Sequence, residues 1–416
     1  MKGTIISDIF GTGQQVLPNL AIVEARVLDP ASGAIQEGAT VYVEGGTIRG
    51  IEPGAIPGSA ELVINARGRT ILPGLIDAHV HFASFADTHD QEMLGVTPET
   101  MVASTLRGAA SAARMLASGV TTARDLGCKH AGIFGLRQAF ATGQLRGPRL
   151  LVAGAGITMT GGTAHRSCAI EADGADAVRQ VARSQVRRGA DFVKMFISSG
   201  ILHPSASEGG IQYTREELGA GIEEAHRAGM PAAIHASWDE GIRLSVELGA
   251  DTIEHGHEIT EPAAKQMAER GAFLVPTIWH YQRIALHGKE MGVAQVIIDR
   301  ARKVSRLHAE SMIRAWKAGV PIAAGTDSGG PRYPSGSFHL ELCYMAEVGM
   351  NPLDVLRSAT WGAARCLRID GQIGRMEPGY AGDLIGVSGD PLDDLSTLRR
   401  PWLVVKAGEV VLRRDD

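Results

Sequence analysis

The chain has 416 residues, of which 44% are hydrophobic and 21% charged, values typical of globular proteins. Its formal net charge is -5, from 41 basic and 46 acidic residues, so its composition gives no reason to expect binding to a nucleic-acid backbone. The four cysteines form no C-x-x-C pair, and no run approaches the roughly 18 uninterrupted apolar residues of a membrane span. We therefore expect a cytoplasmic protein with no membrane partner; a secreted chain whose signal peptide has been removed is the alternative, because it would have the same composition.

The two ends of the chain, residues 1–70 and 366–416, show short strand-like segments separated by turns. In the first segment Val41, Val43 and Ile48 alternate with polar positions. Each end alone is too small to build a good hydrophobic core. We predict that both ends combine into one small β-sandwich domain.

The middle of the chain, residues 71–365, alternates short apolar runs with longer amphipathic stretches that have helical spacing. Eight such runs over this length predict an α/β fold, a (β/α)8 TIM barrel. A doubly wound sheet is the alternative, but neither G-x-G-x-x-G nor G-x-x-x-x-G-K-[ST] occurs in the sequence. The runs are TILPGLIDAHVHF, GVTTARDLG, RLLVAGAGI, ADFVKMF, MPAAIHAS, ADTIEHG, GAFLVPTI and VPIAAGTDS.

Metal-ligand residue types stand where these predicted strands end, at the edge where barrels build their active sites. His79 and His81 are two positions apart on one strand, so both side chains face the same side. The other candidates are His235, His255 and Asp327. One strand-end histidine alone is most often a core residue, but packing poorly explains four histidines and an aspartate at successive strand ends.

Lys194 lies between Val193 and Met195 in an apolar run, although the chain has only 8 lysines among its 41 basic residues. An unpaired ammonium group there carries a large desolvation cost. A structural ion pair is one explanation. The other is a reactive amine with a lowered pKa, which can add carbon dioxide to give an anionic, bidentate carbamate ligand.

These residues resemble the amidohydrolase superfamily, in the branch with a carboxylated lysine and two metals. The resemblance covers nearly the whole chain, from about residue 21 onward, and it implies the fold predicted above. Within the superfamily the sequence is most similar to prolidase-like and Xaa-Arg carboxypeptidases and to ochratoxin-type amidases. The motifs are LPGLIDAHVHF, FVKMF, IHAS, IEHG, GTDS, ITMTGGTAHRS and, for the β-sandwich, GATVYVEGGTIRGI and RMEPGYAGDLIGV.

The resemblance implies a site with two divalent metal ions, for which Zn²⁺ suits the ligand types. Three residues would hold one ion, two histidines would hold the other, and Lys194, carboxylated by carbon dioxide, would bridge both. A hydroxide bridging the ions would attack an amide carbonyl, with Asp327 as general base and then general acid. By position, the two ligand sets are His79, His81 and Asp327, and His235 and His255.

The resemblance also implies the reaction class. Deaminases of the superfamily use one metal and carry a Glu three residues after the fifth strand's His, where this chain has Trp238. Together with Lys194, this favours a two-metal hydrolase. The expected substrate is a small-molecule amide, either a dipeptide cut at its C-terminal peptide bond or an N-acyl amino acid, and the expected assembly is a homo-oligomer.

Substrate-binding residues are harder to predict. His165, after the third strand, is a candidate for a substrate carbonyl or carboxylate, and Tyr213 could reach a carboxylate through its hydroxyl. Each also has a purely structural explanation: His165 could be an ordinary loop histidine, and Tyr213 could be a packing residue at the start of a helix. Trp279, His280, Tyr281 and Arg283 could line the pocket, Arg283 or Arg332 could pair with a carboxylate, and His257 and His89 are expected behind the ligands or on the surface.

Three other functions remain to be weighed. A lactonase or cyclic-amide hydrolase could use the same metal centre, and the sequence alone does not separate it from peptide hydrolysis. A non-catalytic scaffold of this kind usually lacks some ligands, whereas every ligand position is filled here. A serine hydrolase is disfavoured because no G-x-S-x-G motif occurs.

Overall fold

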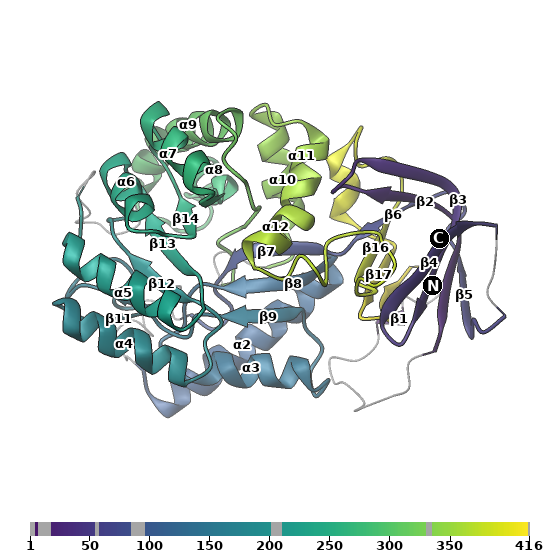
Figure 1. The fold of residues 1–416 in the computed structure, drawn as a ribbon, viewed down its shortest axis with the longest axis horizontal. Helices are drawn as coiled ribbons and strands as arrows, with labels where there is room; N and C mark the ends of the chain where they lie inside the picture. The colour runs from purple at the N-terminus through teal and green to yellow at the C-terminus, as the bar shows by residue number, and fades with distance from the viewer. Residues whose placement is uncertain are drawn as a thin grey trace.

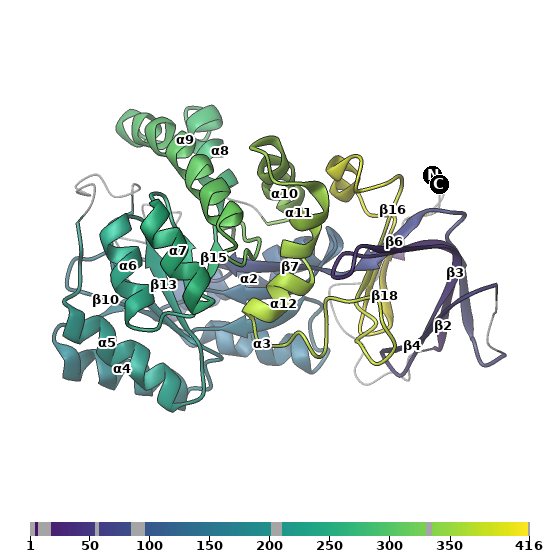
Figure 2. The same cartoon turned by 45° about the horizontal axis from the view of Figure 1, so that its top comes forward.

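The computed structural model of the chain describes residues 5–6, 18–54, 58–84, 96–200, 210–329 and 335–414. Parallel strands surrounded by helices make up one part of the molecule, and a sheet at one end carries both ends of the chain (Figure 1, Figure 2). This mixed α/β architecture with an end sheet agrees with the prediction from the sequence.

Strands from both chain ends form one sheet, which has nine strands among the described residues. Its order is β1–β18–β17–β16–β6–β2–β3–β4, with β5 paired to β2. The antiparallel β6–β16 pair places Ile71 opposite Gly386, which joins distant parts of the sequence. The strands are β1 (Ile5–Ile6), β2 (Leu20–Asp29), β3 (Ala34–Glu44), β4 (Thr47–Pro53), β5 (Leu62–Asn65), β6 (Thr70–Pro73), β16 (Leu384–Val387), β17 (Leu403–Lys406) and β18 (Glu409–Arg413).

The end sheet is stabilised by its own apolar cluster. Val41 and Val43 are buried, as their alternation with polar residues predicts, and they pack with Ile22, Leu384 and Leu403. Because this cluster draws on both ends of the chain, neither end could bury it alone.

The other strands are parallel and form two sheets, β7–β8–β9 and β11–β10–β12–β13–β14–β15. Nearly all of their residues are buried, as expected for strands covered by helices. The strands are β7 (Leu75–Val80), β8 (Val120–Asp125), β9 (Arg149–Val152), β10 (Gly156–Thr158), β11 (Ala169–Glu171), β12 (Val193–Phe196), β13 (Ala232–Ala236), β14 (Thr252–His255) and β15 (Phe273–Val275).

Helices alternate with these strands along the chain and lie outside them (Figure 1). Among the described residues, no helix combines the length and apolar character needed to cross a bilayer. The helices are α2 (Pro98–Ala117), α3 (Gly132–Ala141), α4 (Ala175–Arg187), α5 (Arg215–Arg227), α6 (Asp239–Glu247), α7 (Glu261–Arg270), α8 (Ile278–His287), α9 (Gln295–Lys317), α10 (Phe338–Glu347), α11 (Pro352–Ser358), α12 (Trp361–Cys366) and the short 3₁₀ helix η1 (Leu395–Arg399).

The segment 320–328, the last predicted apolar run, joins the two parallel sheets. The backbone N–H of Ala323 donates to the carbonyl of Leu274 on β15. On its other side, Ala78 on β7 donates to Ala324, and the segment's Asp327 donates to His79 at 2.8 Å. The segment therefore lies between β15 and β7 and carries Asp327 to the end of β7.

Two of the predicted apolar runs each contain two strands. TILPGLIDAHVHF divides at Gly74 into β6 of the end sheet and β7 of the parallel strands. A side chain at Gly74 would place its Cβ 2.2 Å from Thr121 Oγ1, so the close approach of the two regions requires glycine. RLLVAGAGI divides at Gly154, whose φ of 69° again favours glycine, into β9 and β10.

Candidate metal centre

Five predicted ligand residues converge where the parallel strands end. The ring centroids of His79 and His255 lie 4.9 Å apart, and those of His235 and His255 lie 4.6 Å apart. Asp327 Oδ1 lies 3.5 Å from His79 Nε2 and 3.4 Å from His81 Nε2. Ligand atoms of His79, His81 and Asp327 all lie within 4.8 Å of one another, as a bound cation would need.

Strained backbone positions this cluster. His255, Thr277 and Asp327 have φ values of 73°, 52° and 55°, a left-handed conformation that costs a residue with a side chain about 1–3 kcal/mol. Close packing also contributes, because a Cβ at Gly325 would lie 2.8 Å from His79 Cβ. Strained residues at strand ends are typical of functional sites, where the surrounding structure holds them in place.

Lys194 on β12 is buried, with 1% of its surface exposed. Its Nζ has no hydrogen-bond partner among the described residues and lies 4.8 Å from the centroid of the Phe196 ring. Burial lowers the pKa of Lys194 to about 8, although the charge of Glu254 opposes this shift. The side chain therefore has the properties of a reactive amine, since part of it is neutral near physiological pH.

Three of the histidines use one ring nitrogen within the protein. His79 Nδ1 lies 2.8 Å from Glu254 Oε2, His255 Nδ1 lies 2.8 Å from Thr277 Oγ1, and His81 Nδ1 lies 3.2 Å from the Gly127 carbonyl oxygen. Partners of this kind fix the tautomer and ring orientation of metal-binding histidines. They leave the Nε2 atoms available as ligands.

Behind His79, a charged pair is completely buried. Arg124 Nη2 donates to Glu254 Oε1 at 2.8 Å, and Arg124 Nε donates to the carbonyl of Ala78. Thr252 Oγ1 donates to the same Glu254 oxygen. Burial alone would raise the pKa of Glu254, but Arg124 and His79 outweigh it and hold that pKa below its usual range. Glu254 is therefore an anion that accepts a hydrogen bond from His79 Nδ1–H.

The protonation states suit metal binding. Burial lowers the pKa of His79 and His81, and lowers those of His235 and His255 well below the usual value. Burial would raise the pKa of Asp327, but the neighbouring His280, His79 and His81 outweigh it, so its carboxyl is ionised. Neutral imidazoles, a carboxylate and an amine that can form a carbamate fit divalent cations such as Zn²⁺.

Comparison with known proteins shows the family. A model of the amidohydrolase family matches residues 70–411. The chain belongs to this family. The predicted resemblance is thus confirmed, and this amidohydrolase is a hydrolytic enzyme from a family in which metal dependence is general.

Named relatives agree with the predicted branch. Ochratoxinase of Aspergillus niger is 28% identical over 367 residues, which cover 80% of this chain and 73% of that protein. Imidazolonepropionase of Salinispora arenicola is 25% identical over a region that covers 84% of this chain and 86% of that protein. A crystal structure of a Xaa-Pro dipeptidase with bound methionine in its active site has a TM-score of 0.85 and 31% identity, covering 94% of this chain and 99% of that one.

The predicted substrate-binding residues have different environments in the amidohydrolase. His165 is half-buried in the loop after β10, and its Nδ1 lies 2.7 Å from the carbonyl oxygen of Gly162. Tyr213 is buried, and its hydroxyl donates to the carbonyl of Ala172 at 2.7 Å. The Tyr213 hydroxyl is therefore occupied within the protein and braces the segment that precedes α4.

Of the other predicted pocket residues, His280 lies close to a ligand, with Nδ1 3.6 Å from Asp327 Oδ2. Tyr281 and His257 lie behind His255, with ring centroids 6.1 and 6.0 Å from its ring. The predictions for Arg332 and His89 fall outside the described residues.

Sequence reasoning missed the residues that support the ligands from behind. Arg124 had a signal, because it is a charged residue inside an apolar strand run, as Lys194 is. Glu341 had none. It lies on α10, and its two carboxyl oxygens accept hydrogen bonds from the N–H groups of Ile278 and Trp279, directly after Thr277.

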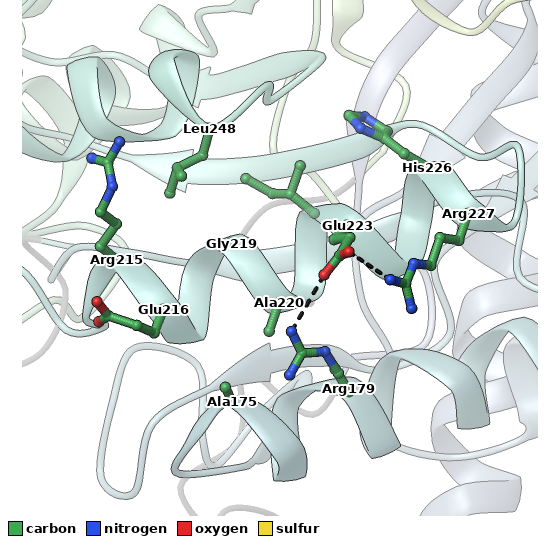
Figure 3. Close-up of a pocket in the computed structure, with 11 residues that line it drawn as sticks. Ala175, Arg179, Arg215, Glu216, Gly219, Ala220, Glu223, His226, Arg227 and Leu248 are labelled. Carbon is green, nitrogen blue, oxygen red and sulfur yellow. Dashed lines mark hydrogen bonds and ion pairs between the residues drawn. The ribbon is translucent and has the colours of Figure 1, made fainter.

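A separate groove, with a volume of about 880 Å³, lies between α4 and α5 on the outside of the molecule (Figure 3). An ion pair crosses it, because Arg179 on α4 contacts Glu223 on α5, and Arg227 pairs with the same Glu223 within α5. None of its lining residues belongs to the ligand cluster, so this groove is not the candidate metal centre.

Proposed function

We propose that this amidohydrolase is a binuclear metal-dependent enzyme that hydrolyses an amide bond, either the C-terminal peptide bond of a dipeptide or the amide of an N-acyl amino acid. One observation carries the proposal. The His79, His81 and Asp327 ligand atoms gather within 4.8 Å, in a chain whose Lys194 is buried with no hydrogen-bond partner for Nζ among the described residues. Burying an amine without a partner costs folding free energy, which favours a functional role for Lys194 over a purely structural one.

In this proposal His79, His81 and Asp327 hold one cation, and His235 and His255 hold the second. Lys194 bridges both after its neutral amine attacks carbon dioxide, which forms an N–C bond and releases one proton to solvent. Bound divalent cations, Zn²⁺ being the best fit, lower the pKa of water to about 7 and polarise a carbonyl group.

Asp327 is the proposed general base and general acid. Its carboxylate is ionised and 15% exposed, so it can accept a proton from the attacking water and deliver it to the leaving amine. The backbone N–H of Asp327 donates to the backbone carbonyl of His79, which holds the carboxylate beside His79 at the end of β7 and His81 directly after it.

Two relatives support the proposed substrate class. The Xaa-Pro dipeptidase supports a substrate with an amide next to a carboxylate, and ochratoxinase supports hydrolysis of an amide bond. We assign His165 to the substrate carbonyl or carboxylate, because it lies in the loop after β10, beyond the strand ends. The enzyme would act as a small homo-oligomeric carboxypeptidase or dipeptidase.

The proposed organisation follows the same family pattern. Residues 71–365 form the catalytic (β/α)8 barrel, and residues 1–70 and 366–416 form the β-sandwich domain. Segment 320–328 supports closure of the barrel, since it hydrogen-bonds to β15 and to β7.

A cyclic-amide hydrolase or lactonase is the second candidate. The similarity to imidazolonepropionase, whose name denotes a ring substrate, favours it over the remaining alternatives. Both candidates use the same centre and differ only in the shape of the substrate.

A hydrolysis panel on metal-replete protein tests the proposal. The panel contains Xaa-Pro, Xaa-Arg and Xaa-hydrophobic dipeptides, N-acyl amino acids, lactones and cyclic amides. We expect turnover of a linear amide next to a carboxylate, lost on treatment with a chelator. Turnover of rings alone would favour the second candidate, and chelator-resistant turnover would contradict both.

A further inference from the structure

Helix α9 holds the backbone around His255 through side chains on one of its faces. His308 Nε2 donates to the carbonyl of His255 at 2.8 Å. Ser311, one turn further along, donates its hydroxyl hydrogen to the carbonyl of Gly256 at 2.8 Å and accepts the N–H of Ile259 at 2.6 Å. Two side chains of one helix thus hold three backbone groups of the segment that follows β14.

These contacts fall on the strained part of the chain. His255 and Gly256 are both left-handed, with φ values of 73° and 67°. The two carbonyls of these residues are the ones that His308 and Ser311 contact. A left-handed pair of this kind persists when its surroundings fix it, and α9 supplies that restraint.

The polar residues on this face of α9 contact one short segment of backbone. His308 and Ser311 are completely buried, so each hydrogen bond is made away from water. Arg314, the next residue on the same face, donates to the carbonyl of Ile259 at 2.6 Å. Simple packing of α9 would not need three polar residues at successive turns on one short segment, because apolar side chains such as Met312 already fill its buried face.

We propose that His308 and Ser311 are positioning residues that fix the His255 imidazole for metal binding. The inference rests on the proposed function, in which His255 is a ligand. They act through the backbone, whereas Thr277 contacts the His255 ring directly. Substituting either residue should therefore lower the affinity for the cation held by His235 and His255. The affinity for the cation held by His79, His81 and Asp327 should not change.

Ser311→Ala is the first test, with Met312→Ala as the matched control, because Met312 is a buried neighbour on α9 that makes none of these hydrogen bonds. Both variants should lower the melting temperature. Metal content is measured by mass spectrometry, and Zn²⁺ affinity by competition with a chelator. We expect Ser311→Ala to weaken one of two bound ions by about 10–100-fold and Met312→Ala to weaken neither.

A pair of His308 variants tests the same contact independently, and carries the comparison alone if Ser311→Ala does not fold. His308→Gln keeps an N–H donor near the Nε2 position, whereas His308→Leu removes it. We expect His308→Leu to weaken the same ion and His308→Gln to restore most of its affinity.

The outcomes separate this inference from the proposed function. Equal Zn²⁺ affinity in Ser311→Ala and Met312→Ala, or in the two His308 variants, would overturn the positioning role. If His255→Ala also binds as much Zn²⁺ as the unmodified protein, the proposed metal centre itself is wrong.

Discussion

The end sheet and the carboxyl ends of the parallel strands both contain left-handed residues, but for different reasons. In the end sheet Arg67 and Ala407 adopt this conformation in short turns between strands. At the parallel strand ends, His255 and Thr277 adopt it while completely or almost completely buried, and their side chains contact each other. Strain in the first region closes turns and, at Glu24, accompanies a register shift within β2. Strand-end strain instead orients side chains toward a shared centre.

The two regions also bury different chemistry. The core of the end sheet is an apolar cluster that includes Ile22, Val41 and Leu403. The strand ends bury a lysine, three of the four candidate ligand histidines and the Arg124–Glu254 pair, all of which are expensive to remove from water. This difference indicates that the end sheet stabilises the fold, whereas the polar groups buried at the strand ends lower stability and serve the chemistry of the site. Substitutions in the two regions should therefore affect different measurements.

Of these substitutions, Asp327→Asn should have the largest effect, and the quantity affected should be the catalytic rate. We expect kcat to fall by about 10²–10⁴-fold, because the amide cannot accept a proton, while metal content is retained. Mass spectrometry of the bound metal and steady-state kinetics check both parts. Asp299→Asn, an exposed change on α9, serves as the control and should leave kcat unchanged. A fall in kcat of less than about tenfold would show that Asp327 is not the proton carrier.

Glu254→Gln should destabilise the strand-end region even without metal. It leaves the buried Arg124 guanidinium without its counter-charge, at a cost of about 3–5 kcal/mol. Urea unfolding of the metal-free protein measures this loss. The surface pair of Glu223 and Arg227 gives the control, and Glu223→Gln should cost less than about 1 kcal/mol. Similar losses in both variants would remove the contrast between buried and surface pairs.

Leu403→Ala should act on the end sheet alone. Removing this completely buried side chain leaves a cavity and should lower the free energy of unfolding by about 2–5 kcal/mol. Neither kcat nor KM should change at a temperature where the variant is folded. A clear change in kcat would mean that the end sheet takes part in catalysis, and would weaken the division between the regions.

Glu341 should give a smaller, pH-dependent effect. Burial raises its pKa from 4.5 to about 8, against the two backbone N–H groups that it accepts. Between these values the folded state binds more protons than the unfolded chain, so this contribution to stability is complete below about pH 4.5 and is lost as pH rises towards 8.

Between pH 5 and pH 7 the loss should be roughly 2–3 kcal/mol. Glu341→Gln removes the titrating group, so its unfolding free energy should fall less than that of the unmodified protein over the same range. Parallel pH profiles for the two proteins would show that Glu341 does not titrate in this window.

How far the sequence could predict the structure depends on how local each signal is. The alternation of His79 and His81, and the isolated Lys194 in an apolar run, are visible within a few residues, and the structure places these residues beside or within the predicted strands. The division of the first run at Gly74 was not predicted, because the restriction comes from Thr121 on another strand.

The supporting residues show the same limit. Ser311 and Glu341 occupy ordinary helical sequence, and their roles arise only when distant segments meet: Ser311 contacts a backbone group 55 residues away, and Glu341 contacts one 63 residues away. The Tyr213 hydroxyl was predicted to reach a substrate, and its partner Ala172 lies 41 residues earlier. The residues that gather at strand ends can be predicted from one sequence, but the contacts that hold them in place cannot.

Metal stoichiometry measured together with activity tests the central claim most directly. Protein prepared with bicarbonate and Zn²⁺ should hold about two ions per chain, and Lys194→Ala, which lacks the bridging group, should hold at most about one and lose activity. Fully active protein with less than about one ion per chain, or a Lys194→Ala variant that keeps both ions and full activity, would contradict the account.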